Sequence, residues 1–263
     1  MDLARRLEQT DITVSETSLN RWVERHPELG ATSASLAGGK ALFFGTASPL
    51  SQALGVGMNG PVTADDFDRL ESFFIARGAP VVISLCPLAD PTVLTLVHER
   101  RYRITHFENT LIRPIAPGEN FDVPTWIQQT APNDRESWCR TVMMGFSEGE
   151  PVNDDTVRTF SAFFGADSSR AWSAFDEHGT LQGGAAASYF SGAAMLYGDA
   201  TLPTFRGRGA QTALINARLK MAVETGCNLA MACTVPGTVS QRNYERAGFR
   251  VVYTKPMLAR DSF

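Results

Sequence analysis

The sequence predicts an α/β protein composed of two domains of similar size. Helix-like and strand-like segments alternate along the whole chain, which is the pattern of sheets flanked by helices. The chain has 263 residues, which exceeds one ordinary compact domain and suits two. Two prolines and a glycine interrupt the periodic pattern between Arg113 and Asn120, so we expect domains at 1–118 and 119–263.

The first half has three expected helices and two expected strands. Thr63 is followed by two acidic residues, which is typical of a helix N-terminus. A β-branched run starting at Val81 predicts a buried strand, and four phenylalanines nearby are expected in the core: Phe43, Phe44, Phe73 and Phe74. The helices are expected at about 16–26, 63–77 and 90–100, and the strands at 81–86 and 102–112.

The second half repeats the order of the first. Helices are expected at about 134–145, 154–164, 207–225 and 238–247, and strands at 169–176, 180–190, 193–202, 229–235 and 250–258. A shift of 147 positions places Cys233 on Cys86 and Gly248-Phe249 on Arg101-Tyr102. Identities are few, but the recurring order of elements favours an internal duplication.

Composition excludes several classes of protein. A net charge of -4 argues against a nucleic-acid binder, and the 43% hydrophobic and 20% charged residues are ordinary for a soluble globular chain. No apolar run is long enough to span a bilayer and the first residues lack a signal-peptide core, so we expect a cytoplasmic protein without membrane contact. The four cysteines and four histidines are dispersed, so neither a metal site nor a disulfide framework is expected.

The most informative segment is the turn Arg206-Gly207-Arg208-Gly209. The preceding strand ends at Leu202, because Pro203 has no N–H with which to continue the pairing. Glycines let successive backbone N–H groups converge, and the N-terminus of the following helix adds a partial positive charge, so such a turn binds a pyrophosphate. A Gly-x-Gly turn also occurs for backbone geometry alone, and the turn by itself leaves both interpretations open.

Together with Tyr244-x-x-x-Gly248-Phe249, this turn resembles the GNAT superfamily of N-acetyltransferases. The acetyl-CoA signature of that family is Gln/Arg-x-x-Gly-x-Gly/Ala; Arg206 and Gly209 match it, whereas Gln211 stands where the family has Gly or Ala. The resemblance covers about 120–263. It implies two GNAT-like domains, each with a splayed mixed sheet, and an acetyl-CoA site between the strands at 193–202 and 229–235. The implied cofactor-binding residues are Ala200, Thr201, Leu202, Arg206, Gly207, Arg208, Gly209, Ala210, Gln211, Thr212, Ser240 and Asn243.

The resemblance also implies a catalytic residue. Amine attack on the thioester expels a thiolate, and the phenol of Tyr244 would protonate the sulfur as a general acid; the alternative is that Tyr244 only packs its helix on the sheet. Asp199, in an otherwise apolar strand before the turn, is the candidate general base, with a surface carboxylate as the alternative. Gly237 replaces an asparagine that the family often uses to contact coenzyme A.

The first half carries no equivalent chemistry. The corresponding loop, Gly55–Thr63, lacks the arginine and has Pro61 where an N–H would be needed, and Val97 corresponds to Tyr244. We interpret this half as a degenerate copy that covers the sheet and helps form the acceptor cleft. The alternative is that Gly55–Gly60 holds a second ligand.

The expected activity is acetyl transfer from acetyl-CoA to a primary amine of a small molecule or peptide. The alternative is a non-catalytic acyl-CoA-binding regulatory module. A relative that transfers aminoacyl or peptidyl groups from a charged tRNA is a third option, which the acidic chain disfavours. The acceptor, the acyl-chain preference and the oligomeric state are not indicated by the sequence.

Overall fold

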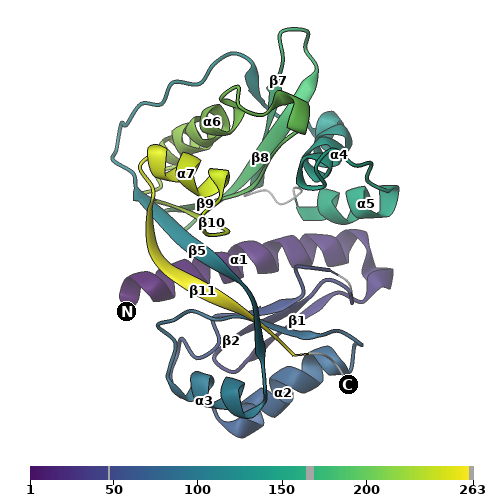
Figure 1. Ribbon diagram of the computed structural model, residues 1–263, viewed down its shortest axis with the longest axis vertical. Helices are drawn as coiled ribbons and strands as arrows, with labels where there is room; N and C mark the ends of the chain where they lie inside the picture. Colours follow the sequence, from purple (N-terminus) through teal and green to yellow (C-terminus); the bar gives the residue numbers. More distant parts are fainter. Residues whose placement is uncertain (47, 164–168, 261–263) are drawn as a thin grey trace. The chain divides into compact units, whose positions relative to one another are not determined.

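The computed structural model describes residues 1–46, 48–163 and 169–260 (Figure 1). The chain divides into two compact units: unit 1 is Met1–Thr110 with Tyr253–Phe263, and unit 2 is Leu111–Val252. The sequence suggested a boundary at residue 118 and placed the whole C-terminal end in the second domain. In the structure, unit 1 instead ends at Thr110 and also includes Tyr253–Phe263. The last strand leaves unit 2 because its second part pairs antiparallel with a strand of unit 1, from Met257 opposite Ser84 to Arg260 opposite Val81.

Unit 1 is a mixed sheet with three helices. Its helices are α1 (Asp2–Arg25), α2 (Ala64–Ile75) and α3 (Thr92–Glu99), and its strands are β1 (Thr32–Leu36), β2 (Gly39–Phe43), β3 (Gln52–Leu54), β4 (Val81–Ser84) and most of β5 (Arg103–Pro114) and β11 (Arg250–Arg260). The strand order is β1-β2-β3-β4-β11-β5. Strands β3 and β4 are parallel and connected through α2. The core includes Phe43 and Phe74, and Phe73 packs against it; Phe44 is buried as well.

Helix α1 is much longer than the sequence pattern suggests. The expected helix at 16–26 begins instead at Asp2, because the first part of α1 buries charged residues that hide its apolar periodicity. Glu8 and Asp11 are buried on α1 and face the buried Lys255 of β11, with Nζ 3.5 Å from Glu8 and 3.1 Å from Asp11. No helix among the described residues combines the length and apolar character needed to cross a bilayer.

Unit 2 contains the second mixed sheet region. Its helices are α4 (Arg135–Phe146), α5 (Asp154–Phe163), α6 (Ala210–Glu224) and α7 (Val239–Arg246), and its strands are β6 (Ile127–Gln129), β7 (Ser169–Phe175), β8 (Leu181–Phe190), β9 (Ala193–Thr201) and β10 (Leu229–Thr234), with the adjoining parts of β5 and β11. The strand order is β5-β10-β9-β8-β7-β6.

Helices α6 and α4 cover opposite faces of the unit 2 sheet. Ala185 and Ala187 of β8 belong to the core cluster that contains α6, whereas Ala186 belongs to the cluster of α4. Successive side chains of a strand point to opposite faces, and Figure 1 shows the two helices on either side of β8. Helix α6 begins after the short segment that follows β9, so its N-terminus lies near the end of that strand.

The two units share one order of elements. In unit 1 the order β3, α2, β4, α3, β5 matches β9, α6, β10, α7, β11, and the first and third elements are parallel in both series. This agrees with the predicted duplication. That the first half is a degenerate copy of the second stays a prediction.

Candidate active site

Strands β9 and β10 separate along their length. They pair in parallel only from Ala193 opposite Leu229 to Leu196 opposite Ala232, yet β9 continues to Thr201 and β10 to Thr234. Where two strands part, the backbone N–H and C=O groups facing the gap can bond to the amides of an extended ligand. The splayed sheet expected at this place is therefore present.

A β-bulge lies in the separated part of β9. Gly184 pairs with Ala200 and Ala186 with Tyr197, so the single residue between them on β8 faces two residues of β9, Gly198 and Asp199. Gly198 has a φ of 70°, a conformation that favours glycine. A bulge of this kind bends the strand and changes the direction of a side chain. Here it sets the position of Asp199.

The turn after β9 leads into a helix N-terminus that protein side chains leave open. Gly207 and Gly209 have φ values of 79° and 85°, and a Cβ built on either would meet open space, so the left-handed backbone itself requires glycine. Gly209 is the N-cap of α6, and within the described residues no side chain caps this helix and no acidic residue lies in its first turn. The first N–H groups of α6 therefore form a site for an anion.

A cavity of about 880 Å³ opens in front of this helix end. Its walls come from the end of α4, the end of β9, the turn, the first turn of α6, and α7. Twelve predicted cofactor residues were named from the sequence, and ten line this cavity, whereas Leu202 and Arg208 do not. The ten are Ala200, Thr201, Arg206, Gly207, Gly209, Ala210, Gln211, Thr212, Ser240 and Asn243, and the predicted catalytic residue Asp199 lines the cavity as well.

Arg206 holds the turn against α4. Its guanidinium donates to the carbonyls of Thr201 (3.1 Å) and Gly145 (2.9 Å) and to both carboxylate oxygens of Glu148 (2.6 and 3.1 Å). Hydrogen bonding from Arg206 lowers the pKa of Glu148 below its usual value. Gly145 allows the close approach of α4, because a Cβ there would lie 2.9 Å from that of Ala200. The positive charge of Arg206 is thus partly neutralised by Glu148.

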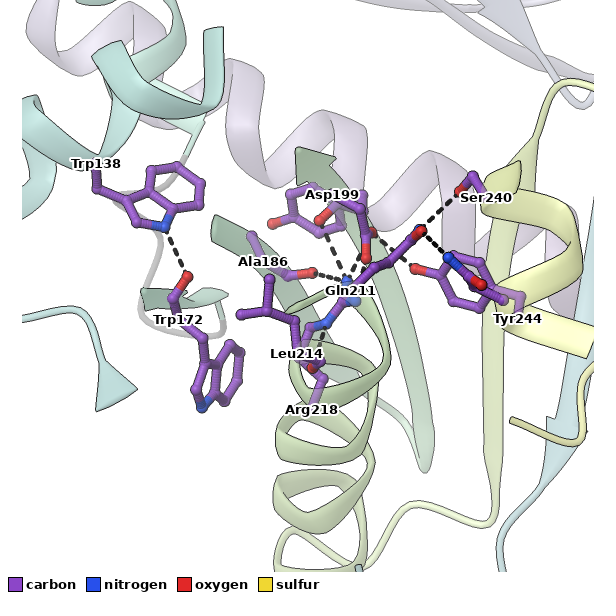
Figure 2. Close-up of polar contacts among 11 residues, drawn as sticks. Trp138, Trp172, Ala186, Asp199, Gln211, Leu214, Arg218, Ser240 and Tyr244 are labelled. Carbon is purple, nitrogen blue, oxygen red and sulfur yellow. Dashed lines mark hydrogen bonds and ion pairs between the residues drawn. The ribbon is translucent and has the colours of Figure 1, made fainter. Parts of the chain in front are cut away.

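Gln211 joins the two helices at the cavity wall. Its Nε2 donates to Oγ of Ser240 at 2.8 Å (Figure 2). Its Oε1 accepts from Nδ2 of Asn243 at 2.7 Å. The residue that departs from the Gly/Ala of the signature therefore connects α6 to α7. It brings together three of the predicted cofactor residues.

The two predicted catalytic residues meet at the bulge. The Tyr244 hydroxyl donates to Oδ2 of Asp199 at 2.8 Å, and the Arg218 guanidinium donates to both oxygens of Asp199, to Oδ2 at 2.9 Å (Figure 2). Tyr244 is 1% exposed and Arg218 0% exposed. The ring of Phe249 packs edge-on against that of Tyr244, with centroids 5.0 Å apart. Asp199 lines the cavity; Tyr244 and Arg218 lie behind it.

Burial dominates the electrostatics of this group. It raises the pKa of Tyr244 well above the usual value; the charge of Arg218 lowers this pKa and that of Asp199 raises it. Burial by itself would lower the pKa of Arg218, but the attraction and hydrogen bonds of Asp199, together with the nearby phenols of Tyr244 and Tyr189, outweigh it and the pKa is raised. Tyr244 therefore keeps its proton and Arg218 its charge at any pH near neutrality.

The comparison with protein families gives the class of this region. Residues 135–249 match the model of the Acetyltransferase (GNAT) family. The GNAT match runs from the first residue of α4 to the residue before β11, so it includes the bulge, the turn, α6 and α7. All predicted site residues lie inside it.

Solved GNAT structures share the fold. A GCN5-related N-acetyltransferase from Kribbella flavida has a TM-score of 0.65 at 16% identity, with 94% of each chain covered. A GCN5-related N-acetyltransferase from Sphaerobacter thermophilus has a TM-score of 0.54 at 15% identity; 70% of this chain is covered, and only 60% of the length of that protein. A tandem GNAT protein from the clavulanic acid biosynthesis pathway has a TM-score of 0.53 at 15% identity, covering 70% of this chain and 64% of its own.

These likenesses confirm the predicted fold class, a mixed sheet flanked by helices. A comparison with curated proteins finds no match.

Arg218, which lies within the residues that match the GNAT model, was not predicted from the sequence. The pattern that could have identified it is a single arginine on the buried face of α6, four residues after Leu214, combined with a single acidic residue in the apolar strand β9. Neither Arg218 nor Asp199 can be buried alone at acceptable cost, so two such residues in neighbouring elements indicate a pair.

Proposed function

We propose that this protein transfers the acetyl group of acetyl-CoA to a primary amine of a small molecule or peptide. One observation carries the proposal: the uncapped N-terminus of α6, with its two left-handed glycines, opens into the same cavity that Asp199 lines. The diphosphate of the cosubstrate would bind to the N–H groups of this helix end. The pantetheine arm would bond to backbone groups of Ala200 and Thr201. Leu202, also expected from the sequence, fits this role less well, because its N–H already donates to the carbonyl of Gln182 and its carbonyl accepts from the amide of Phe205.

Acetyl-CoA supplies the acetyl group as a thioester. The amine nitrogen attacks the carbonyl carbon, a C–N bond forms, and the C–S bond breaks with its electron pair going to sulfur. Tyr244 gives its hydroxyl proton to the sulfur, and the nitrogen releases a proton that restores the phenol. The products are the N-acetylated amine and the free thiol of coenzyme A.

Tyr244 is the candidate proton donor because its hydroxyl donates to Asp199, which lines the cavity. Burial keeps this hydroxyl protonated. A hydroxyl hydrogen rotates about the C–O bond, so turning it from Asp199 toward a neighbouring sulfur requires no movement of the ring. This rotation makes the proton available to the leaving group.

Asp199 has two candidate roles. The sequence suggests a general base. Both of its oxygens, however, already accept hydrogen bonds, so taking up a proton would require losing one of them. We therefore favour Asp199 as the group that orients Tyr244, while its role as a base stays a prediction.

A second function is favoured by the burial of Tyr244. Its phenol is 1% exposed and is not among the described residues lining the cavity. A protein that binds acyl-CoA for regulation would need no accessible acid. Such a module would bind acetyl-CoA and release no thiol.

Thiol release distinguishes the two functions. The wild-type protein is incubated with acetyl-CoA and, in turn, spermidine, lysine, kanamycin and a tetrapeptide, and free thiol is measured. We expect release with at least one amine, and a loss of roughly 10²–10⁴-fold in kcat for Tyr244→Phe with unchanged affinity for acetyl-CoA. Tyr189→Phe is the matched control, because the hydroxyl of Tyr189 donates to the carbonyl of Arg218 and Tyr189 does not line the cavity. Binding without release supports the regulatory module, and no binding at millimolar acetyl-CoA overturns both.

We also infer that the first half of the chain holds no second coenzyme A. The N-terminus of α2, at the position equivalent to α6, is closed by its own side chains: Oγ1 of Thr63 accepts from the amide of Asp66, and Oδ2 of Asp66 accepts from that of Thr63. In the preceding loop the amide of Gly57 donates to the carbonyl of Ala37. These contacts support the interpretation of this half as a degenerate copy.

A further inference from the structure

Arg218 occupies the interior of unit 2 between α6 and two strands. Its Nε donates to the carbonyl of Leu214 one turn earlier (3.0 Å), and Nη1 donates to the carbonyl of Ala186 on β8 (3.1 Å) and to Oδ2 of Asp199 (Figure 2). Nη2 donates to Oδ1 of the same carboxylate. A rigid guanidinium therefore determines the position of both oxygens of Asp199.

This ion pair needs an explanation other than stability. Removing two charges from water costs about as much as their attraction returns, and a buried pair is often no more stabilising than an apolar pair of similar volume. The pair lies where its geometry matters, because Asp199 is at the bulge of β9, lines the cavity, and accepts the hydroxyl of Tyr244.

We propose that Arg218 is a positioning residue for acetyl transfer: by holding both oxygens of Asp199, it fixes the cavity-lining acceptor that orients the Tyr244 hydroxyl. This inference rests on the proposed function, in which Tyr244 protonates the leaving thiolate. Arg218 itself does not line the cavity. It acts through Asp199 and Tyr244, and its loss is not expected to weaken binding of acetyl-CoA.

Electrostatics gives the direction of the effect. The charged groups that face Tyr244 are Asp199 from β9 and Arg218 from α6, and Phe249, the residue before β11, packs edge-on against the ring. Burial raises the pKa of Tyr244, Arg218 lowers it, and Asp199 raises it. Without Arg218 the unbalanced carboxylate would raise this pKa further and make the phenol a weaker acid.

Arg218 could instead serve only to hold the bulge, since it also binds the carbonyl of Ala186. The two roles differ in one respect. If Arg218 acts through Tyr244, replacing it has no effect on turnover once Tyr244 is phenylalanine, because the effects of groups that work as a unit are not additive. If Arg218 only supports the fold, replacing it slows the wild-type enzyme and the Tyr244→Phe enzyme equally.

The first experiment does not depend on turnover. Protein labelled with 13C at tyrosine Cζ is prepared as wild type, Arg218→Met, Arg218→Lys and Tyr189→Phe, and the Tyr244 signal is assigned with Tyr244→Phe. Tyr189 donates to the backbone carbonyl of Arg218 at 3.1 Å, so its variant perturbs the same turn of α6 without touching Asp199. We expect the Tyr244 signal to move in Arg218→Met, to move less in Arg218→Lys, and to stay in Tyr189→Phe. An unchanged signal in Arg218→Met overturns the proposal.

The second experiment measures acetyl transfer with the amine identified by thiol release. For Arg218→Met we expect kcat to fall roughly 10- to 100-fold, part of the contribution of a general acid, while KM for acetyl-CoA stays within about twofold of wild type. In the Tyr244→Phe background the same substitution is expected to change kcat by less than about twofold. An equal loss in both backgrounds overturns the proposal.

A variant in which both members of the ion pair are replaced controls for misfolding of the single variant. Arg218→Met with Asp199→Asn leaves no unpaired buried charge, so it keeps the fold where the single variant fails. We expect it to remain as slow as Arg218→Met, and recovery of wild-type kcat would overturn the proposal. Absence of thiol release from the wild-type protein would defeat the proposed function instead, and the Tyr244 signal would still decide the role of Arg218.

Discussion

The hydroxyl of Tyr244 and Oδ2 of Asp199 lie 2.8 Å apart, although the two residues are 45 positions apart in the chain. One is on a short helix and the other on a bulged strand, and Arg218 from a third element completes the group. Asp199 lines the cavity in front of the open helix end. The helix end that forms the anion site and the carboxylate that binds the candidate acid therefore line the same cavity.

Replacing Asp199 with asparagine should destabilise the protein strongly. The guanidinium of Arg218 would remain fully buried without a counter-charge, which costs about 3–5 kcal/mol of unfolding free energy. Chemical denaturation of Asp199→Asn, compared with the double variant that also carries Arg218→Met, measures this cost. The double variant should recover most of the loss; a single variant as stable as wild type would mean that the pair is not formed.

The capping box of α2 should make stability depend on pH. Hydrogen bonding from Thr63 lowers the pKa of Asp66 from 3.8 to about 2. A carboxyl group with a lowered pKa in the folded state contributes stability that is present above pH 3.8 and is lost as the pH falls toward about 2. Melting temperatures of wild type and Asp66→Asn should therefore differ at neutral pH and converge over this interval. A constant difference across the interval would contradict the prediction.

Two equivalent positions at the ends of α3 and α7 should respond in opposite ways. Arg101 has a φ of 59°, a left-handed conformation costly for a residue with a Cβ, and Gly248 has a φ of 87°. Arg101→Gly should raise the free energy of unfolding by about 1 kcal/mol, and Gly248→Ala should lower it by a similar amount. Urea denaturation measures both. Arg101→Gly being less stable than wild type would show that the arginine side chain outweighs the strain.

Gly184 should not tolerate alanine. A Cβ there would lie 2.1 Å from Nε1 of Trp138, which donates to the carbonyl of Trp172 at 2.8 Å. We expect Gly184→Ala to lower the unfolding free energy by about 1–3 kcal/mol through overpacking. The same substitution in a Trp138→Leu background is the control, where the cost should be smaller. An equal cost in the two backgrounds would show that the indole is not the source of the strain.

The order of elements and the turn were accessible from the sequence because both depend on local signals. Thr63 marks the start of α2 through its capping box, and Gly207 and Gly209 mark the turn through backbone conformation. Ten cofactor candidates consequently line one cavity, as their spacing around that turn suggested.

The missing parts depend on contacts between distant residues. The first half of α1 was not recognised because Glu8 and Asp11 are compensated by Lys255, which is 244 positions after Asp11. Strands β1 to β3 were missed because small and polar residues weaken their alternation, as in Thr32–Leu36. The burial of Arg218 depends on Asp199, which lies at a bulge in β9, so the sequence of α6 alone does not identify the pair.

The open N-terminus of α6 is the proposed binding site for the diphosphate of acetyl-CoA. Amide NMR of the 15N-labelled protein tests it most directly, with the capped N-terminus of α2 as an internal control. On addition of acetyl-CoA we expect the largest shifts at the amides of Gly209, Ala210 and Gln211, and none at those of Asp66 and Phe67. Unchanged α6 amides at millimolar acetyl-CoA, or larger shifts at α2, would contradict the account.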